Sequence, residues 1–142
     1  MFINLLSELL KHIQKMEKLF EGKTCIAEYN REKQRIRYTF DGYANIDEHK
    51  AMYQKAMAFL ANNKTTAFLF DFRNMKGTFT MLNDFVVQLF RPAVEQGLKK
   101  SAMVLNNDVF TAFSSDDAIK KISLIQVQVF KEINEAETWC DE

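Results

Sequence analysis

The chain has 142 residues, of which 47% are hydrophobic and 27% are charged, and its formal net charge at pH 7 is zero. These values suit one globular domain, which at this length folds without a disulfide or a metal. Proteins that bind nucleic acid usually carry a basic excess. Here the short basic clusters Lys99-Lys100 and Lys120-Lys121 fall near expected helix ends, where cations complement the helix dipole. The composition therefore predicts a single domain with no nucleic-acid partner.

The two cysteines, Cys25 and Cys140, form no CxxC pair and suit a reducing compartment, with one disulfide between them as the alternative. No apolar run approaches the roughly 20 residues that a membrane-spanning helix needs. The N-terminus lacks the basic leader and the cleavage site of a signal peptide. We therefore expect a cytoplasmic protein without a membrane span.

Residues 2–20 have the pattern of an amphipathic helix, because apolar side chains recur three and four residues apart. These are Phe2, Leu6, Leu9, Ile13, Met16 and Phe20. We expect this N-terminal helix, residues 1–20, to precede an α/β domain over residues 21–142. Its apolar stripe must be buried on the domain, on a second copy of the chain or on another protein.

Short β-type runs at residues 25–29 and 35–40 predict two strands joined by a polar hairpin turn. A helix is expected next, because Asn45 followed by Glu48 makes a capping-box-like start. The near-continuous apolar run at residues 66–72 predicts a strand that is covered on both faces.

A loop over residues 74–80 should lead into a second helix, capped by Thr80, in which Pro92 causes a kink or a break. Strands are expected at 101–105 and 127–130. Helices are expected from Ser114 to about Leu124 and over 133–140. The predicted fold is therefore α/β, with a mixed, mostly parallel sheet of about five strands and covering helices, in the order β-β-α-β-α-β-α-β-α.

The sequence contains no Gly-rich phosphate loop, no GxSxG motif and no His, Cys or carboxylate cluster at metal-ligand spacing. The histidines His12 and His49 lie in different predicted helices. A Cys-His nucleophile pair would require Cys25 or Cys140 to meet His49 in space, which we do not expect. We predict no catalytic residue, no cofactor and no metal.

Ligands of open α/β sheets bind beyond the carboxyl ends of the parallel strands. Here those ends carry the polar residues Asp71, Arg73, Asn74, Asn106 and Asp108. Arg73 with Thr78 and Thr80, beside a helix N-terminus, could hold a phosphate or a carboxylate. The alternative, which we favour, is structural: Asp71 and Arg73 pair with each other or with neighbours, and residues 106–108 serve as turn and capping residues.

Two further features have two interpretations each. Arg91, directly before Pro92, belongs either to a kinked helix or to a surface on which a partner docks. The thirteen phenylalanines form either a bulky core or the wall of a lipid pocket.

Several segments share their order and residues with a known family. They are 71–77 (DFRNMKG), 90–94 (FRPAV), 97–100 (GLKK) leading into 102–105 (AMVL), 107–110 (NDVF) and 135–139 (EAETW). Over about residues 16–142 the chain resembles the SpoIIAA-like group of STAS-domain proteins. The resemblance implies a domain of the predicted order that works by binding other proteins. The related CRAL-TRIO fold binds lipids in an apolar pocket.

The family's anti-sigma-factor antagonists switch by phosphorylation of a Ser or Thr in an Asp-Ser-Ser-Gly-like motif, at the start of the second helix that covers the sheet. Residues 76–81 read KGTFTM instead, so the motif is missing. Thr78 or Thr80 could be the phosphorylated residue only because of its position in the sequence. We predict a non-catalytic STAS-like regulatory or interaction module with a protein partner, and we expect a homodimer. The alternative is a carrier or sensor of an apolar, lipid-like ligand. An enzyme that uses the strand-end polar residues ranks last.

Overall fold

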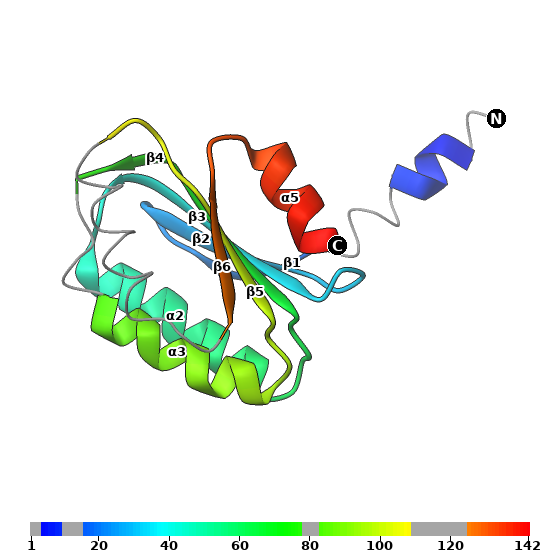
Figure 1. The fold of residues 1–142 in the computed structure, drawn as a ribbon, viewed down its shortest axis with the longest axis horizontal. Coiled ribbons are helices and arrows are strands. Elements are labelled where there is room, and N and C mark those ends of the chain that lie inside the picture. The colour runs from blue at the N-terminus through cyan, green and yellow to red at the C-terminus, as the bar shows by residue number, and fades with distance from the viewer. Residues whose placement is uncertain (1–3, 10–15, 78–82, 109–124) are drawn as a thin grey trace.

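The computed structural model describes residues 4–9, 16–77, 83–108 and 125–142. One six-stranded sheet forms the framework, with the strands in the spatial order β1-β2-β3-β4-β5-β6 (Figure 1). The strands are β1 (Met16–Glu21), β2 (Cys25–Asn30), β3 (Arg35–Tyr43), β4 (Ala67–Lys76), β5 (Lys100–Val104) and β6 (Gln126–Phe130). The labelled helices are α2 (Ile46–Leu60), α3 (Asn83–Glu95) and α5 (Ile133–Asp141).

The sheet is mixed, as predicted. β1, β2 and β3 pair in antiparallel fashion, while β3, β4, β5 and β6 are parallel. The helices α2 and α3 lie side by side on one face of the sheet, and α5 lies on the other (Figure 1). The α/β class and the mixed sheet are confirmed, with six strands in place of about five. The helix expected from Ser114 to about Leu124 lies outside the described residues.

The prediction of one helix over residues 2–20 is wrong for its last residues, which form the strand β1. Helical structure covers only residues 4–9 of the described part of that segment, and Met16–Glu21 is the edge strand β1. Its register on β2 shifts between Lys18 and Phe20, so Leu19 is the extra residue of a bulge. Leu19 and Phe20 both pack against the main core. The bulge therefore interrupts the alternation of inward and outward residues that identifies a strand in a sequence.

The main core lies between the sheet and the α2–α3 layer. Alternate residues of β4 point into it, because successive side chains of a strand face opposite ways. Phe70 stacks on Tyr38 of β3 with ring centroids 4.7 Å apart, and Phe72 stacks on Phe40 at 4.9 Å. The buried phenylalanines of the described residues are Phe40, Phe68, Phe70, Phe72 and Phe90. They support the core interpretation of the aromatic excess.

The capping residue of α2 is the predicted one. The side chain of Asn45 accepts a hydrogen bond from the backbone N–H of Glu48 at 3.1 Å. The carboxylate of Glu48 does not complete a capping box, however. It accepts hydrogen bonds from the backbone N–H and the hydroxyl of Thr24, at 2.6 and 2.8 Å, and thereby attaches α2 to the β1–β2 turn.

Two predictions around α3 need correction. The helix continues through Pro92 from Asn83 to Glu95, so of the predicted kink or break the break does not occur. The chain leaves the helix at Gly97, which has φ 110°, and the N–H of Leu98 bonds to the carbonyl of Ala93 at 2.9 Å. The predicted loop over 74–80 is wrong for residues 74–76, which extend β4 and pair with the equally extended end of β3.

Candidate functional site

The carboxylate of Asp71 is the centre of an ion cluster on the α5 face of the sheet. It accepts hydrogen bonds from Arg73 through the backbone N–H at 3.1 Å, Nε at 2.9 Å and Nη2 at 2.9 Å. Arg37 of β3 adds a bond from Nη2 at 3.0 Å, and its Nη1 lies 3.6 Å from Glu137 of α5. Asp71 is 2% exposed, so these arginines supply its solvation.

The protonation state of Asp71 follows from this cluster. Burial is the largest single influence and by itself raises the pKa of the carboxyl group. The hydrogen bonds and positive charge of Arg73, with the charge of Arg37, outweigh burial and hold the pKa below its ordinary value. A general base needs a pKa near the working pH. Asp71 is therefore an ionised structural carboxylate, and the structural alternative is confirmed for the Asp71–Arg73 pair.

Asn106 connects the end of β5 to the extended end of β4. β5 stops at Val104, so the β4 carbonyls beyond that row lack a partner strand on this side. The side-chain amide of Asn106 donates to the carbonyls of Phe72 at 3.2 Å, Arg73 at 3.0 Å and Met75 at 2.9 Å. Its oxygen accepts the backbone N–H of Asp108 at 2.7 Å. Asn106 is thus a turn residue, which also binds the backbone of Asp108.

The other predicted site residues do not join one pocket. Asn74 is exposed on β4, and Arg91 is exposed on α3, which packs on the opposite face of the sheet from Asp71. Thr78 and Thr80 lie outside the described residues. An anion held by Arg73, Thr78 and Thr80, the less favoured alternative, would have to compete with Asp71 for the guanidinium group of Arg73.

Of the nucleophile and base candidates, Cys25 and His49 are buried and Cys140 is half-buried. The thiol of Cys25 lies 3.7 Å from the carboxylate of Glu48, and burial, with the charge of Glu48, raises its pKa to about 12. Burial also raises the pKa of the Cys140 thiol, and it lowers that of His49, whose ring centroid lies 5.2 Å from that of Phe40. Both thiols favour the protonated form, which is the poorer nucleophile, and His49 favours the neutral form.

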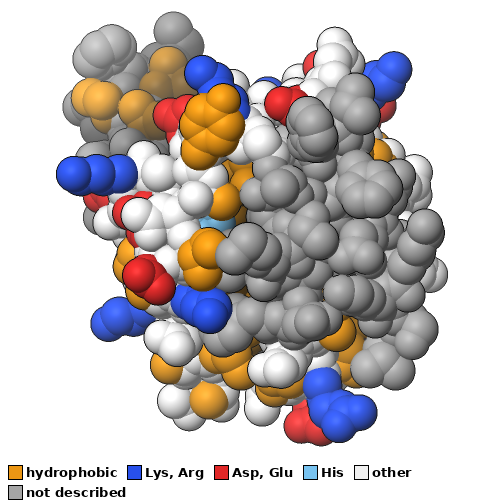
Figure 2. Space-filling view, turned by 90° about the vertical axis from the view of Figure 1, so that its left-hand side faces the viewer, with side chains coloured by type: hydrophobic (Ala, Val, Ile, Leu, Met, Phe, Trp, Pro, Cys, Tyr) orange, Lys and Arg blue, Asp and Glu red, His pale blue; other side chains and the backbone are white. Residues whose placement is uncertain are grey.

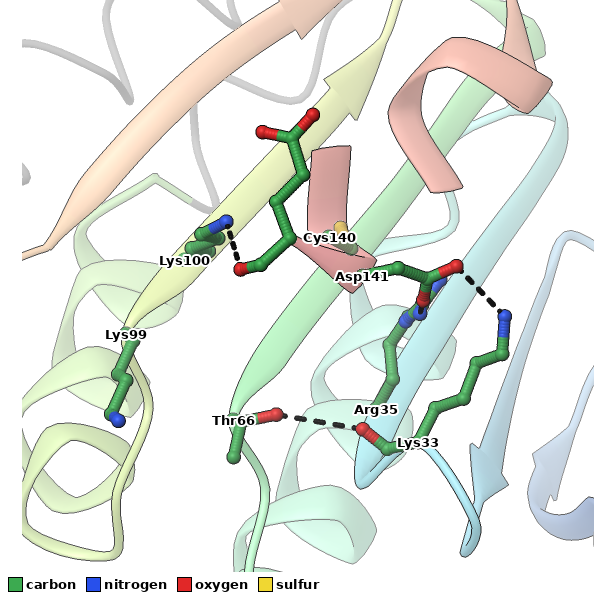
Figure 3. A pocket seen from close by; sticks show the side chains of 8 residues that line it. Lys33, Arg35, Thr66, Lys99, Lys100, Cys140 and Asp141 are labelled. Carbon is green, nitrogen blue, oxygen red and sulfur yellow. Dashed lines mark hydrogen bonds and ion pairs between the residues drawn. The ribbon is translucent and has the colours of Figure 1, made fainter. Parts of the chain in front are cut away.

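The structure shows a polar cavity of about 350 Å³ where α5 ends against the sheet (Figure 3). We call it the basic notch. It is lined by Lys33, Arg35, Thr66, Lys99, Lys100, Cys140, Asp141 and Glu142. It lies at the N-terminal ends of β4 and β5, which is the opposite end of the sheet from the one that sequence reasoning selects.

The basic pair Lys99-Lys100 is the sequence signal for this cavity. Its position after a predicted helix suggests that it complements the dipole of that helix. Lys100 instead binds the C-terminal end of a different helix, α5. Its ammonium group donates to the backbone oxygens of Trp139 at 2.9 Å and Glu142 at 3.0 Å. It also lies 4.9 Å from the centroid of the Trp139 ring.

Metal sites and membrane spans are both lacking in the described part of the chain. No three His, Cys, Asp or Glu side chains there come close enough together to bind a metal ion. None of its helices has the length and apolar character needed to cross a membrane.

Comparison with known proteins gives a family and a fold. The family model described as SpoIIAA-like matches residues 35–141. An uncharacterised protein of the DUF3478 family with a SpoIIAA-like fold, from Shewanella loihica PV-4, superposes with a TM-score of 0.56 at 12% sequence identity. The match covers 88% of this chain and 91% of that one. No curated protein matches the sequence. Because the family model covers more than half of the chain, the chain belongs to the SpoIIAA-like family.

Proposed function

We propose that this chain is a non-catalytic regulatory or protein-interaction module. The supporting observation is the internal use of the strand-end polar groups. Asp71 is satisfied by Arg73 and Arg37, and the amide of Asn106 is satisfied by three backbone carbonyls. Groups that are held in this way stabilise a rigid surface and are not free to move protons or attack a substrate. SpoIIAA-like domains typically act by binding other proteins, which is the function this proposal assigns.

The proposed docking surface is the rim where β3 and β4 end. Tyr43 is 71% exposed there, although it is a large aromatic residue. Its ring lies beside Gly77, where an added Cβ would be 3.1 Å from the ring. Figure 2 looks onto this end of the molecule and shows hydrophobic side chains interspersed with charged ones. Exposed aromatic residues on a rigid rim are frequent anchors of protein interfaces.

The test is capture of the partner with wild-type and variant protein. Tyr43→Ala should lower partner affinity at least about tenfold, as expected for an aromatic anchor, while Tyr43→Phe should retain most of it. Val129→Ala is the matched control, since Val129 is exposed on β6 away from the rim. Equal affinity of wild type and Tyr43→Ala would remove this surface from the proposal.

A phosphorylation switch at Thr78 or Thr80 is part of the same proposal. Thr78→Asp and Thr80→Asp should each weaken partner binding, because they add negative charge to the segment that follows Gly77 in the sequence. Thr138→Asp is the control, since Thr138 is exposed on α5. If neither Thr78→Asp nor Thr80→Asp changes partner affinity, the switch is absent.

The oligomeric state and the ligand content have one common test, native mass spectrometry of the purified chain. We propose a homodimer, supported by the exposed Leu5, Leu6 and Leu9 of the short N-terminal helix. A dimer mass that reverts to the monomer when residues 1–15 are removed would agree with this. A monomer mass at all concentrations would contradict it. A co-purified lipid would instead favour a carrier.

A further inference from the structure

Two cationic residues of the basic notch belong to one row of paired residues that crosses three neighbouring strands. Arg35 of β3 pairs with Ala67 of β4, and Ala67 pairs with Lys100 of β5. Directly paired residues of neighbouring strands point to the same face, so the two long cationic side chains lie about 10 Å apart at their backbones. Ala67 between them is buried, and Arg35 and Lys100 on either side of it line the notch. The end of α5 closes the cavity from above (Figure 3).

Some hydrogen-bond donors of the notch have no acceptor among the described residues. The carboxylate of Asp141 bonds to Arg35 and, at 3.0 Å, to Lys33, and it lies between those two cations in Figure 3. Arg35 is only 6% exposed, yet its Nε has no hydrogen-bond partner among the described residues. An ammonium group carries three N–H donors, so Lys100, which gives two to carbonyls, keeps one.

The charges are also unequal. Four cationic side chains line the notch, and the facing carboxylates are those of Asp141 and Glu142. Within the described part of the chain, the ammonium group of Lys99 forms no ion pair or hydrogen bond, and in Figure 3 it stands apart from the carboxylate of Asp141. Attachment of the helix end therefore accounts for Lys33 and Lys100, but not for Lys99 or for the Nε of Arg35.

We propose that the basic notch binds a small molecule through a phosphate monoester group. The guanidinium group of Arg35 and several lysine ammonium groups match the oxygens of a phosphoryl group, and Asp141 shows how an oxyanion is received between Arg35 and Lys33. A cavity of about 350 Å³ is at the small end of ligand pockets, which suits a small phosphate ester. This site is separate from the proposed partner surface, and through it a small molecule could regulate the module.

The experiment is a titration of the isotope-labelled full chain with glycerol phosphate, followed by nuclear magnetic resonance at constant ionic strength with sodium chloride. The Nε–H signal of Arg35 and the backbone amide signals of Thr66, Lys99 and Lys100 should shift together and saturate, with a dissociation constant of ~1 mM or below. Inorganic phosphate should shift the same signals, and glycerol should shift none.

Variants that change one charge distinguish a specific phosphate site from general electrostatic attraction of phosphate to the protein surface. Lys99→Gln should weaken phosphate binding about tenfold, as expected for a lost charge-assisted hydrogen bond. Asp141→Asn should strengthen it, because the competing carboxylate is removed. Lys55→Gln, at an exposed position of α2, makes the same charge change elsewhere and should leave binding unchanged. Shifts that do not saturate, or equal weakening by Lys99→Gln and Lys55→Gln, would overturn the proposal and leave the partner surface untouched.

Discussion

The side chain and the backbone of Arg73 together surround the carboxylate of Asp71, two residues earlier on the same strand. Three donors of one arginine, at 3.1, 2.9 and 2.9 Å, meet the two oxygens of one buried acid. Charge-assisted bonds of this kind are short and strong, and they fix both partners. The end of β4 is therefore held rigid at the place where many α/β proteins keep a reactive group.

Acid should weaken the ion pair of Asp71 with Arg73 and the stability that it contributes. The pKa of Asp71 is lower in the folded chain than its ordinary value, so the unfolded state binds the proton more readily. The stabilisation is thus fully present above the unfolded pKa of about 3.9 and is lost as the pH falls through the lower folded value. Urea unfolding of wild type and Asp71→Asn across this range checks it. The difference between the two free energies of unfolding should shrink toward low pH, and parallel curves would contradict the assignment.

Asn106 should be important for stability although it lies in a turn. Asn106→Ala removes the donor for three carbonyls and should lower the free energy of unfolding by about 1–3 kcal/mol. The neighbouring Asn107 is exposed, so Asn107→Ala should change it by less than about 0.5 kcal/mol. Thermal or urea unfolding of both variants provides the comparison. Equal effects of the two substitutions would show that the Asn106 bonds are not formed in solution.

Gly22 and Glu48 should be energetically coupled. A Cβ at Gly22 would collide with the Glu48 side chain, whose carboxylate bonds to Thr24. Gly22→Ala should therefore displace Glu48 and cost about 1 kcal/mol of stability, a loss similar to that of Glu48→Ala. In the double variant the two losses should not add, and a double-mutant cycle measures this. Additive losses would mean that the β1–β2 turn and α2 are not joined through Glu48.

Sequence alone predicts the elements whose signals are local. The apolar run at 66–72 identifies β4, and Asn45 is recognisable as the cap of α2 because a cap depends on residues three apart. The prediction fails for β1 because the bulge at Leu19 places Leu19 and Phe20 on the core together. The alternation that would identify a strand is therefore missing from this segment.

The candidate sites depend on strand register, which the sequence does not reveal. The pairing of Asp71 with Arg73 is foreseeable, since both lie on one face two residues apart. Asn106 is predictable only as a turn residue. Its three carbonyl partners are available because β4 extends beyond the last residue of β5 that pairs with it, and the sequence does not show this. The basic notch escapes sequence reasoning because Arg35 and Lys100 become neighbours only through the row that passes Ala67.

The most direct test of the central claim, that the strand-end polar residues stabilise the structure and carry out no chemistry, is a double-mutant cycle on Asp71 and Arg73. The free energy of unfolding is measured for wild type, Asp71→Asn, Arg73→Met and the double variant. We predict that both single variants are less stable than wild type and that the coupling energy is about 1–2 kcal/mol. Residues reserved for chemistry are often neutral or stabilising when replaced. Unchanged or increased stability of Asp71→Asn, with no coupling to Arg73, would contradict the claim.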